Sequence, residues 1–473
     1  MDLSEILKGT DALEQKSLLK EERISSLDLT QYYIDQIQAK NPTLNAVVHT
    51  MFAEGIESAE TVDLNKGILS GLPFLMKDLH SVKGHPVTSG SRMLEGYVAP
   101  EDDEYVKRYK QAGLVFLGKT NTPEFGFLPT TDPDFLGPAR NPWDTTRSAG
   151  GSSGGAAAAV AAGMIPFAHG SDGGGSIRIP ASCCGLFGLK PSRGRNPYGT
   201  YMNDFGVTHA LTRSVRDSAA LLDVVKGKGN YEGYPSFTED ILYINEMYKQ
   251  PRKLTIAVAP NWNNQVSITE DNRKALAETK QLLEELGHRV EEDTPVFDFE
   301  QFAKDFITVW IASGSVIIKH LAQLTNRTPL QSNLEPVSYD VFKQGERYSA
   351  SEYEEARVRL NMTAKKMHAF HDKYDVLVTP TLNGLPAEIG SFDHQTNAKL
   401  DMLDTMMNYV SFTQMANATG QPAMSVPLYW NKQGLPIGVH FTGRLGEEDT
   451  LLQLARQLET KKPWINRYED ITV

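Results

Sequence analysis

The chain of 473 residues contains only two cysteines, Cys183 and Cys184, and they are adjacent. A disulfide between neighbouring residues is strained and rare, so we expect two thiols in a reducing compartment and assign the protein to the cytoplasm. Cysteine and histidine together do not have the spacing of a metal site, so no metal ion is expected. These absences argue against disulfide-stabilised secreted proteins and zinc-binding modules.

An excess of basic residues is also lacking, because 47 Lys and Arg stand against 59 Asp and Glu and give a net charge of −12. A surface of this sign repels nucleic acid and anionic membranes, so neither is expected as a partner. The first ten residues have no basic segment followed by an apolar run, as a secretory signal would. The longest apolar segments, 156–168 and 306–322, are too short or too interrupted to span a bilayer and are predicted to be buried helices.

Short apolar runs bounded by glycine and proline alternate with helical patterns along the chain. The runs GLPFLMKD (71–78), KLTIAVAP (253–260) and YDVLVTPT (374–381) are typical of buried strands. Helices are predicted from a capping box at Ser25, ending before Pro42, and over residues 272–287. This alternation predicts one large α/β domain with helices on both faces of a sheet.

The segment GLVFLGKT, residues 113–120, matches the formula of a phosphate-binding loop. That function requires a flexible loop of exposed backbone N–H groups between a strand and a helix. Here the four central residues, Leu-Val-Phe-Leu, favour a buried strand, and NTPEFG follows as a turn instead of a helix. A nucleotide-binding protein without enzymatic activity therefore stays only as a disfavoured alternative.

Two glycine-rich stretches, 149–155 and 169–182, are joined by small apolar residues, which is unlike a linker. Glycines in such a setting mark tight turns or a backbone that approaches another group closely, and close helix–strand packing would explain them equally well. The serines in both stretches suggest a nucleophile, but the chain has no G-x-S-x-G motif for a Ser–His–Asp site. Lys77 ends an apolar strand and would be a candidate base if burial lowers its pKa, although a strand-end lysine can also reach solvent.

Lys77, the GGSSGG segment (150–155) and the GSDGGGSIR segment (170–178) occur together and in this order. In this combination the chain resembles the amidase signature family, over nearly its whole length and most strongly over residues 71–195. The resemblance implies a single three-layer α/β/α domain, residues 1–473, with a mixed, mostly parallel, twisted central sheet. It also implies a helical region over 1–65 and a variable, substrate-facing region over 225–375.

The resemblance assigns a role to each matching residue. It implies that Ser176 is the nucleophile that forms an acyl-enzyme, that Ser152 is a proton-relaying serine on a cis peptide bond, and that Lys77 is the base. It implies an oxyanion hole made by the backbone N–H groups of Gly173, Gly174, Gly175 and Ser176. The implied supporting residues are Ser153, Asp172 and Arg178. The reaction is expected to use no cofactor and to act on a small amide.

Departures from the family pattern narrow the expected function. Ile179 stands where the glutamine-hydrolysing subunit of the tRNA-dependent amidotransferase typically has Gln, which argues against that alternative. An esterase is a second alternative, because the same groups attack esters more easily than amides. Residues 170–195 are most similar to bacterial amidases related to 6-aminohexanoate cyclic dimer hydrolase, so linear, cyclic or oligomeric amides are expected substrates. Tyr198, Tyr201 and Phe205, in the loop 196–206, are candidate pocket residues or core residues, and a homodimer is the default expectation.

Overall fold

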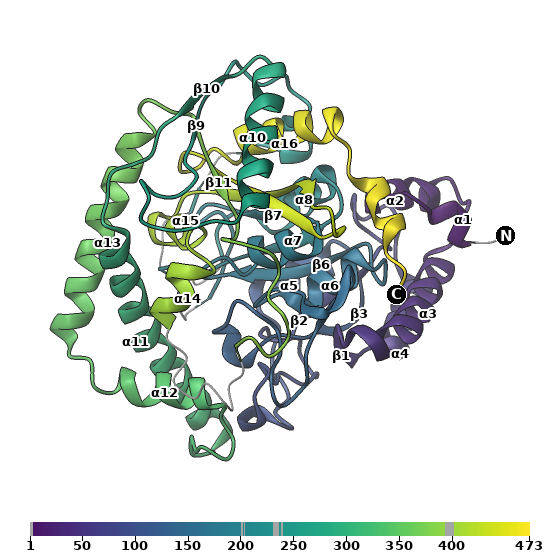
Figure 1. Cartoon of the computed structure of the whole chain (residues 1–473). Helices are drawn as coiled ribbons and strands as arrows, with labels where there is room; N and C mark the ends of the chain where they lie inside the picture. Colours follow the sequence, from purple (N-terminus) through teal and green to yellow (C-terminus); the bar gives the residue numbers. More distant parts are fainter. Residues whose placement is uncertain (1–2, 200–201, 203, 230–235, 238–239, 393–401) are drawn as a thin grey trace.

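A computed structural model describes residues 3–199, 202, 204–229, 236–237, 240–392 and 402–473. Its centre is an eleven-stranded sheet in the order β1-β3-β2-β6-β8-β7-β12-β13-β11-β9-β10, and β4 and β5 form a separate two-stranded sheet (Figure 1). The strands are β1 Val47–Thr50, β2 Pro73–Lys77, β3 Val115–Thr120, β4 Arg140–Asn141, β5 Asp144–Ser148, β6 Phe167–Asp172, β7 Phe187–Lys190, β8 Val207–Thr212, β9 Thr255–Val258, β10 Arg289–Glu292, β11 Val376–Pro380, β12 Ala423–Trp430 and β13 Pro436–Thr442.

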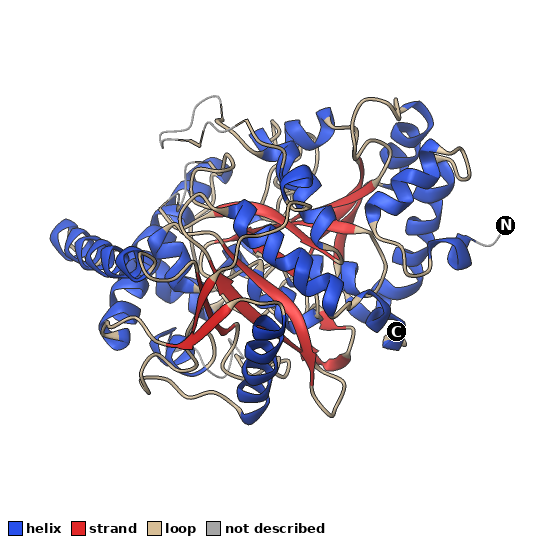
Figure 2. Ribbon diagram, turned by 90° about the horizontal axis from the view of Figure 1, so that it is seen from above, coloured by secondary structure: helices blue, strands red, loops and turns tan. Residues whose placement is uncertain are grey.

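Helices cover both faces of the sheet, so the predicted α/β class with three layers is confirmed (Figure 2). The helices are α1 Leu3–Leu7, α2 Ala12–Lys20, α3 Ser26–Leu44, α4 Phe52–Thr61, α5 Glu104–Gln111, α6 Gly154–Ala161, α7 Arg178–Cys184, α8 Val215–Val225, α9 Tyr243–Glu246, α10 Glu270–Glu285, α11 Phe299–Thr325, α12 Pro336–Gly345, α13 Ala350–Phe370, α14 Met402–Asn408, α15 Gln414–Thr419 and α16 Glu448–Lys461.

The sheet is mixed, as predicted, but the expectation that it is mostly parallel is wrong. Parallel neighbours occur only in its two flanks, β3–β2–β6 and β11–β9–β10. From β6 through β8, β7, β12 and β13 to β11, every described neighbour is antiparallel. The reason lies in the connections: parallel neighbours need a crossover, whereas β12 and β13 are joined directly by the short turn 431–435.

The GLVFLGKT segment contains the buried strand β3, and Lys119 Nζ lies 2.7 Å from Asp78 Oδ1, so this lysine is paired with a carboxylate instead of being free for phosphate.

The capping box at Ser25 begins α3, but the helix continues past Pro42 to Leu44. Because proline has no N–H, the helix lacks one backbone hydrogen bond at this position. From Leu3 to Thr61 the chain forms α1, α2, α3 and α4 with short connections, and β1, which pairs with β3, lies between α3 and α4.

The apolar segment 306–322 belongs to a longer helix than the sequence suggested. The helix α11 has 27 residues and by length and composition alone could cross a membrane, so the expectation that this segment is too short is wrong. In the fold α11 is partly buried and packs against α12, α13 and α14 at one end of the molecule (Figure 1). Cys183 and Cys184 are both buried free thiols, as predicted.

Candidate active site

Lys77 is the last residue of β2 and is completely buried. Its Nζ donates to Ser152 Oγ at 2.7 Å and to Ser171 Oγ at 3.2 Å. Burial lowers the pKa of Lys77 from its ordinary value of 10.5 to about 7, and the nearby Asp172 carboxylate acts in the opposite direction. The amine is therefore able to exist in its neutral form near neutral pH, as a proton acceptor must.

Ser152 lies in the turn between β5 and α6, and its peptide bond with Gly151 is cis, as the family resemblance implied. Glycine is required at 151, because a Cβ there would lie 2.6 Å from the carbonyl oxygen of Thr130. The next residue, Ser153, connects three segments: its N–H donates to the Ser176 carbonyl and its Oγ to the Ser171 carbonyl, both at 3.2 Å. These bonds hold the turn that carries Ser152 against the turn that carries Ser176.

Ser176 lies in the turn between β6 and α7 and is 8% exposed, at the wall of a cavity. Lys77, Ser152 and Ser176 are thus brought to one region from three separate parts of the chain. Among the described residues, no hydrogen bond joins the Ser152 and Ser176 side chains directly. The two turns are instead joined by the bond from the Ser153 N–H to the Ser176 carbonyl, while Lys77 joins Ser152 to Ser171 in β6.

Asp172 organises the glycine turn before Ser176. Its carboxylate accepts from Gly175 N at 2.7 Å and Ile177 N at 3.1 Å, and from Arg178 Nη2 at 2.9 Å and Nε at 3.0 Å. Burial alone would raise the pKa of Asp172, but the charge and hydrogen bonds of Arg178 outweigh burial and hold this pKa far below its ordinary range. Asp172 and Arg178 therefore form a buried ion pair that fixes the shape of the turn.

The predicted oxyanion donors differ in their availability. Gly175 N–H is already bonded to Asp172, whereas no described residue accepts a hydrogen bond from the N–H groups of Gly173, Gly174 or Ser176. The N–H groups of Gly173, Gly174 and Ser176 are therefore better candidates than that of Gly175 for stabilising a negative oxygen.

A network that the sequence analysis missed comes from the loop and helix at 413–417. Asn417 Nδ2 donates to Asp172 Oδ1 at 2.9 Å, and Thr413 Oγ1 donates to the Gly174 carbonyl at 2.7 Å. Arg178 Nη1 donates to the Thr413 carbonyl at 2.8 Å. No local pattern distinguishes these residues, because their partners lie more than 230 positions away in the sequence. Ser171, the second partner of Lys77, was likewise missed, although it lies within the GSDGGGSIR segment.

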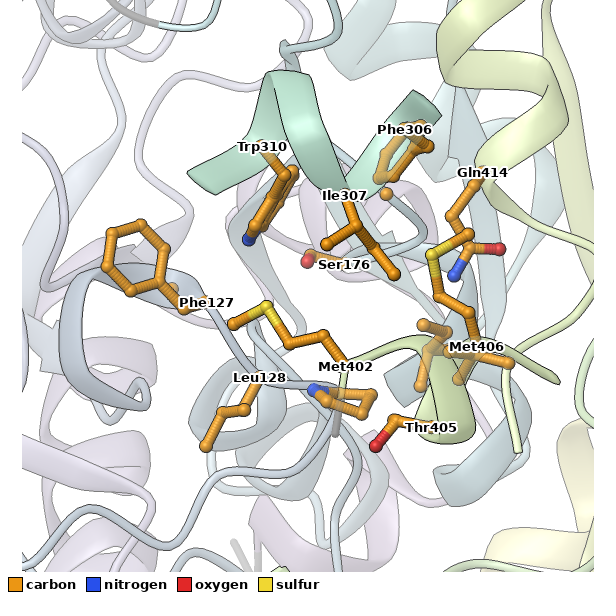
Figure 3. A pocket seen from close by; sticks show the side chains of 15 residues that line it. Phe127, Leu128, Ser176, Phe306, Ile307, Trp310, Met402, Thr405, Met406 and Gln414 are labelled. Carbon is orange, nitrogen blue, oxygen red and sulfur yellow. The ribbon is translucent and has the colours of Figure 1, made fainter. Parts of the chain in front are cut away.

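The cavity beside Ser176 is mostly apolar (Figure 3). The helix α11 contributes Phe306, Ile307 and Trp310, and α14 contributes Met402, Thr405 and Met406. The other lining residues are Gly126, Phe127, Leu128, Pro129, Gly174, Ile179, Val410 and Gln414. None of these described lining residues carries a charge.

The candidate pocket residues of the loop 196–206 do not line this cavity where the structure describes them. Phe205 stacks on Phe306, with ring centroids 4.5 Å apart, and so supports the wall from behind. Tyr198 packs against Gly206. Tyr201 lies outside the described residues. The region 225–375 does contribute, through α11, but residues 126–129 and 402–414 contribute as much.

The fold and this arrangement define an α/β protein with a buried lysine–serine pair next to a second serine, at the edge of an apolar cavity. A family model described as Amidase matches residues 28–452. The chain is 35% identical to a 6-aminohexanoate-cyclic-dimer hydrolase from Pseudomonas sp. (strain NK87), over 98% of this chain and 97% of that protein.

Solved structures agree with the sequence comparisons. A structure of 6-aminohexanoate cyclic dimer hydrolase complexed with substrate superposes with a TM-score of 0.92 at 34% identity, covering 97% of this chain and 98% of that one. A bacterial aryl acylamidase of the amidase signature family superposes with a TM-score of 0.89 at 27% identity, covering 98% of both chains. The protein belongs to the amidase signature family and is an amidase.

Proposed function

We propose that the protein hydrolyses neutral carboxylic amides through an acyl-enzyme on Ser176, with Ser152 as proton relay and Lys77 as base. The observation that carries this proposal is the 2.7 Å contact between Lys77 Nζ and Ser152 Oγ, buried beside the cavity that Ser176 lines. No metal or organic cofactor is needed for this chemistry.

In the first half-reaction, neutral Lys77 takes the hydroxyl proton of Ser152 while Ser152 takes that of Ser176. Ser176 Oγ then bonds to the amide carbon, and the carbonyl oxygen becomes negative. The relay requires Ser176 Oγ to turn towards Ser152 when substrate is bound, since such contacts tighten in the substrate complex. The N–H groups of Gly173, Gly174 and Ser176 would stabilise the oxygen, each by about 3 kcal/mol.

The C–N bond breaks as the proton returns through Ser152 to the leaving nitrogen, because an amide anion is too basic to depart. A water molecule then loses a proton to the same relay, attacks the acyl carbon and releases the carboxylic acid and Ser176. Ser153, Asp172 and Arg178 would support both steps by holding the two turns in place. All of these residues lie within 71–195, which we propose as the catalytic core of a single domain of residues 1–473.

The uncharged cavity favours neutral, apolar groups on the substrate, because burying a charge without a partner is costly. Linear anilides and cyclic amides both satisfy this condition, and the cyclic dimer named for the relatives is a direct substrate to test. Glutamine hydrolysis is disfavoured, since Ile179 places an aliphatic side chain in the cavity wall. Ester hydrolysis by the same groups is expected alongside amide hydrolysis.

The test is a panel of neutral anilides, cyclic amides and esters, assayed with the wild type and Ser176→Ala. The wild type should hydrolyse amides and the variant should lose at least about a thousandfold in rate. A fluorophosphonate should label the wild type at Ser176. Ser182→Ala is the matched control, because the buried Ser182 Oγ accepts a structural bond from Gly438 N at 2.9 Å. Labelling at another residue, or retained activity in Ser176→Ala, would refute the proposal.

A further inference from the structure

Besides Ser176, the described cavity wall has two side chains that end in a polar group, those of Gln414 and Thr405 (Figure 3). Gln414 is 4% exposed and is the first residue of α15. The Oε1 atom of Gln414 lies 3.5 Å from Thr413 Oγ1. This is a long contact, since the Thr413 hydroxyl donates its short hydrogen bond to the Gly174 carbonyl at 2.7 Å. The Nε2 atom of Gln414 donates to no acceptor among the described residues, and Figure 3 shows the amide at the cavity.

The position of Gln414 is fixed relative to the reacting groups. Thr413, immediately before it, is bonded to Gly174 and Arg178, and Asn417, one turn later, is bonded to Asp172. The side chain runs alongside the glycine turn, since a Cβ on Gly174 would lie 3.7 Å from Gln414 Cγ. The Gln414 side chain is therefore held beside the glycine turn whose N–H groups would receive the scissile carbonyl oxygen.

The unused donor of Gln414 opens into the cavity, so a ligand or a water molecule can accept its hydrogen bond there. We propose that Gln414 Nε2 binds a second carbonyl oxygen of the substrate, so that the enzyme selects neutral amides carrying a further hydrogen-bond acceptor close to the scissile group. This inference rests on the proposed function and adds to it a residue that determines specificity.

The acceptor is a neutral carbonyl and not a carboxylate. No Lys or Arg is among the described residues that line the cavity, so a carboxylate bound there would lack a counter-charge. A carbonyl needs only the one donor that Gln414 supplies, and the surrounding Phe306 and Met406 suit its apolar flanks. Substrates with two amide or ketone groups on an aliphatic chain meet these conditions.

The experiment compares matched p-nitroanilides: 4-oxopentanoyl against pentanoyl, and 5-oxohexanoyl against hexanoyl. Each pair differs by one carbonyl in place of a methylene. The quantity measured is the ratio of kcat/KM within a pair, for the wild type and for Gln414→Met, which keeps the length of the side chain but removes the donor. We expect the ratio to fall about 3- to 10-fold in the variant for at least one pair. A pair with the oxo group on the amine side is measured in the same way.

Two further variants make the result specific. Gln414→Glu keeps the shape but replaces the donor with an acceptor, and it should also lose the preference for the oxo substrate. Thr405→Val removes the other polar group, and its ratio should match that of the wild type. Comparing ratios cancels the intrinsic reactivity of each substrate and any general loss of activity.

The same measurements distinguish a failure of the proposed amide hydrolysis from a failure of the role assigned to Gln414. If the wild type hydrolyses none of the amides in a Ser176-dependent manner, the proposed function fails. If it does hydrolyse them but the ratios in Gln414→Met and Gln414→Glu equal those of the wild type in every pair, then Gln414 binds only water and the inference is overturned.

Discussion

Replacing Lys77 with Met should abolish turnover and at the same time stabilise the folded protein at neutral pH. The pKa of this buried amine is lowered from 10.5 to about 7, so at pH 7 the unfolded chain binds its proton far more tightly than the folded chain does. A difference of this size corresponds to a cost of about 5 kcal/mol in the folded state. Methionine has a similar length and carries no charge, so it removes that cost.

The gain is partly offset by lost hydrogen bonds. Lys77 Nζ donates to Ser152 and Ser171, and two bonds from a lysine contribute about 1.5 kcal/mol each. The net stabilisation expected at pH 7 is therefore about 2 kcal/mol. For a chain of 473 residues this raises the melting temperature by about 2 °C, and the midpoint of urea unfolding should increase accordingly.

The sign of the pH dependence provides the sharper assay. Because the folded pKa lies below the unfolded pKa, the wild type gains stability as the pH rises from about 7 towards 10.5, and the Met variant lacks this contribution. Relative to the variant, the wild type should gain about 3 kcal/mol between pH 7 and about pH 9.5. All other titrating groups are common to both proteins and cancel in the difference. A Met variant that is less stable at pH 7, with a pH-independent difference, would refute a neutral buried lysine.

Two other predictions follow from the same contacts. Since Lys77 must be neutral to accept a proton, kcat/KM for a neutral anilide should be about tenfold lower at pH 6 than on its plateau above pH 7. A pH profile that is flat from pH 5 to about 9 would contradict the role of Lys77 as the base. Asn417→Ala should lower the free energy of unfolding, measured with urea, by about 2–3 kcal/mol, because it removes the donor to Asp172 and the acceptor for Arg178, and these two partners are buried. An unchanged urea midpoint would show that this network contributes little to stability.

The sequence identified the parts of the site that have local signals. Lys77 attracted attention because lysine is unusual at the end of an apolar strand, and β2 does end there. The segment 113–120 contains a strand because its central residues are apolar, whatever motif its letters match. The roles of Ser152 and Ser176 came from family resemblance, because serines between glycines have no distinctive physical pattern.

The remainder depended on contacts between distant segments. Trp310, Gln414 and Asn417 lie on helices with ordinary sequences, and only the packing of α11 and α15 brings them to the glycine turn. The mostly parallel sheet was implied by the family resemblance, and the alternation of strands and helices in the sequence does not determine strand direction. The central strands are antiparallel because direct turns and returns without a crossover join several of them.

The electrostatics of the site explain why a lysine can be neutral beside an aspartate. An ionised carboxylate near Lys77 favours the charged amine, and Asp172 does act in that direction. Its charge, however, is already compensated by Arg178, and its oxygens also accept from Gly175, Ile177 and Asn417. Burial of the amine therefore prevails over this attraction, and the pKa of Lys77 settles near 7. Arg178 therefore has two roles. Its bonds to Asp172 fix the shape of the glycine turn. Its charge also weakens the attraction between Asp172 and the protonated amine, so Lys77 can accept and release a proton.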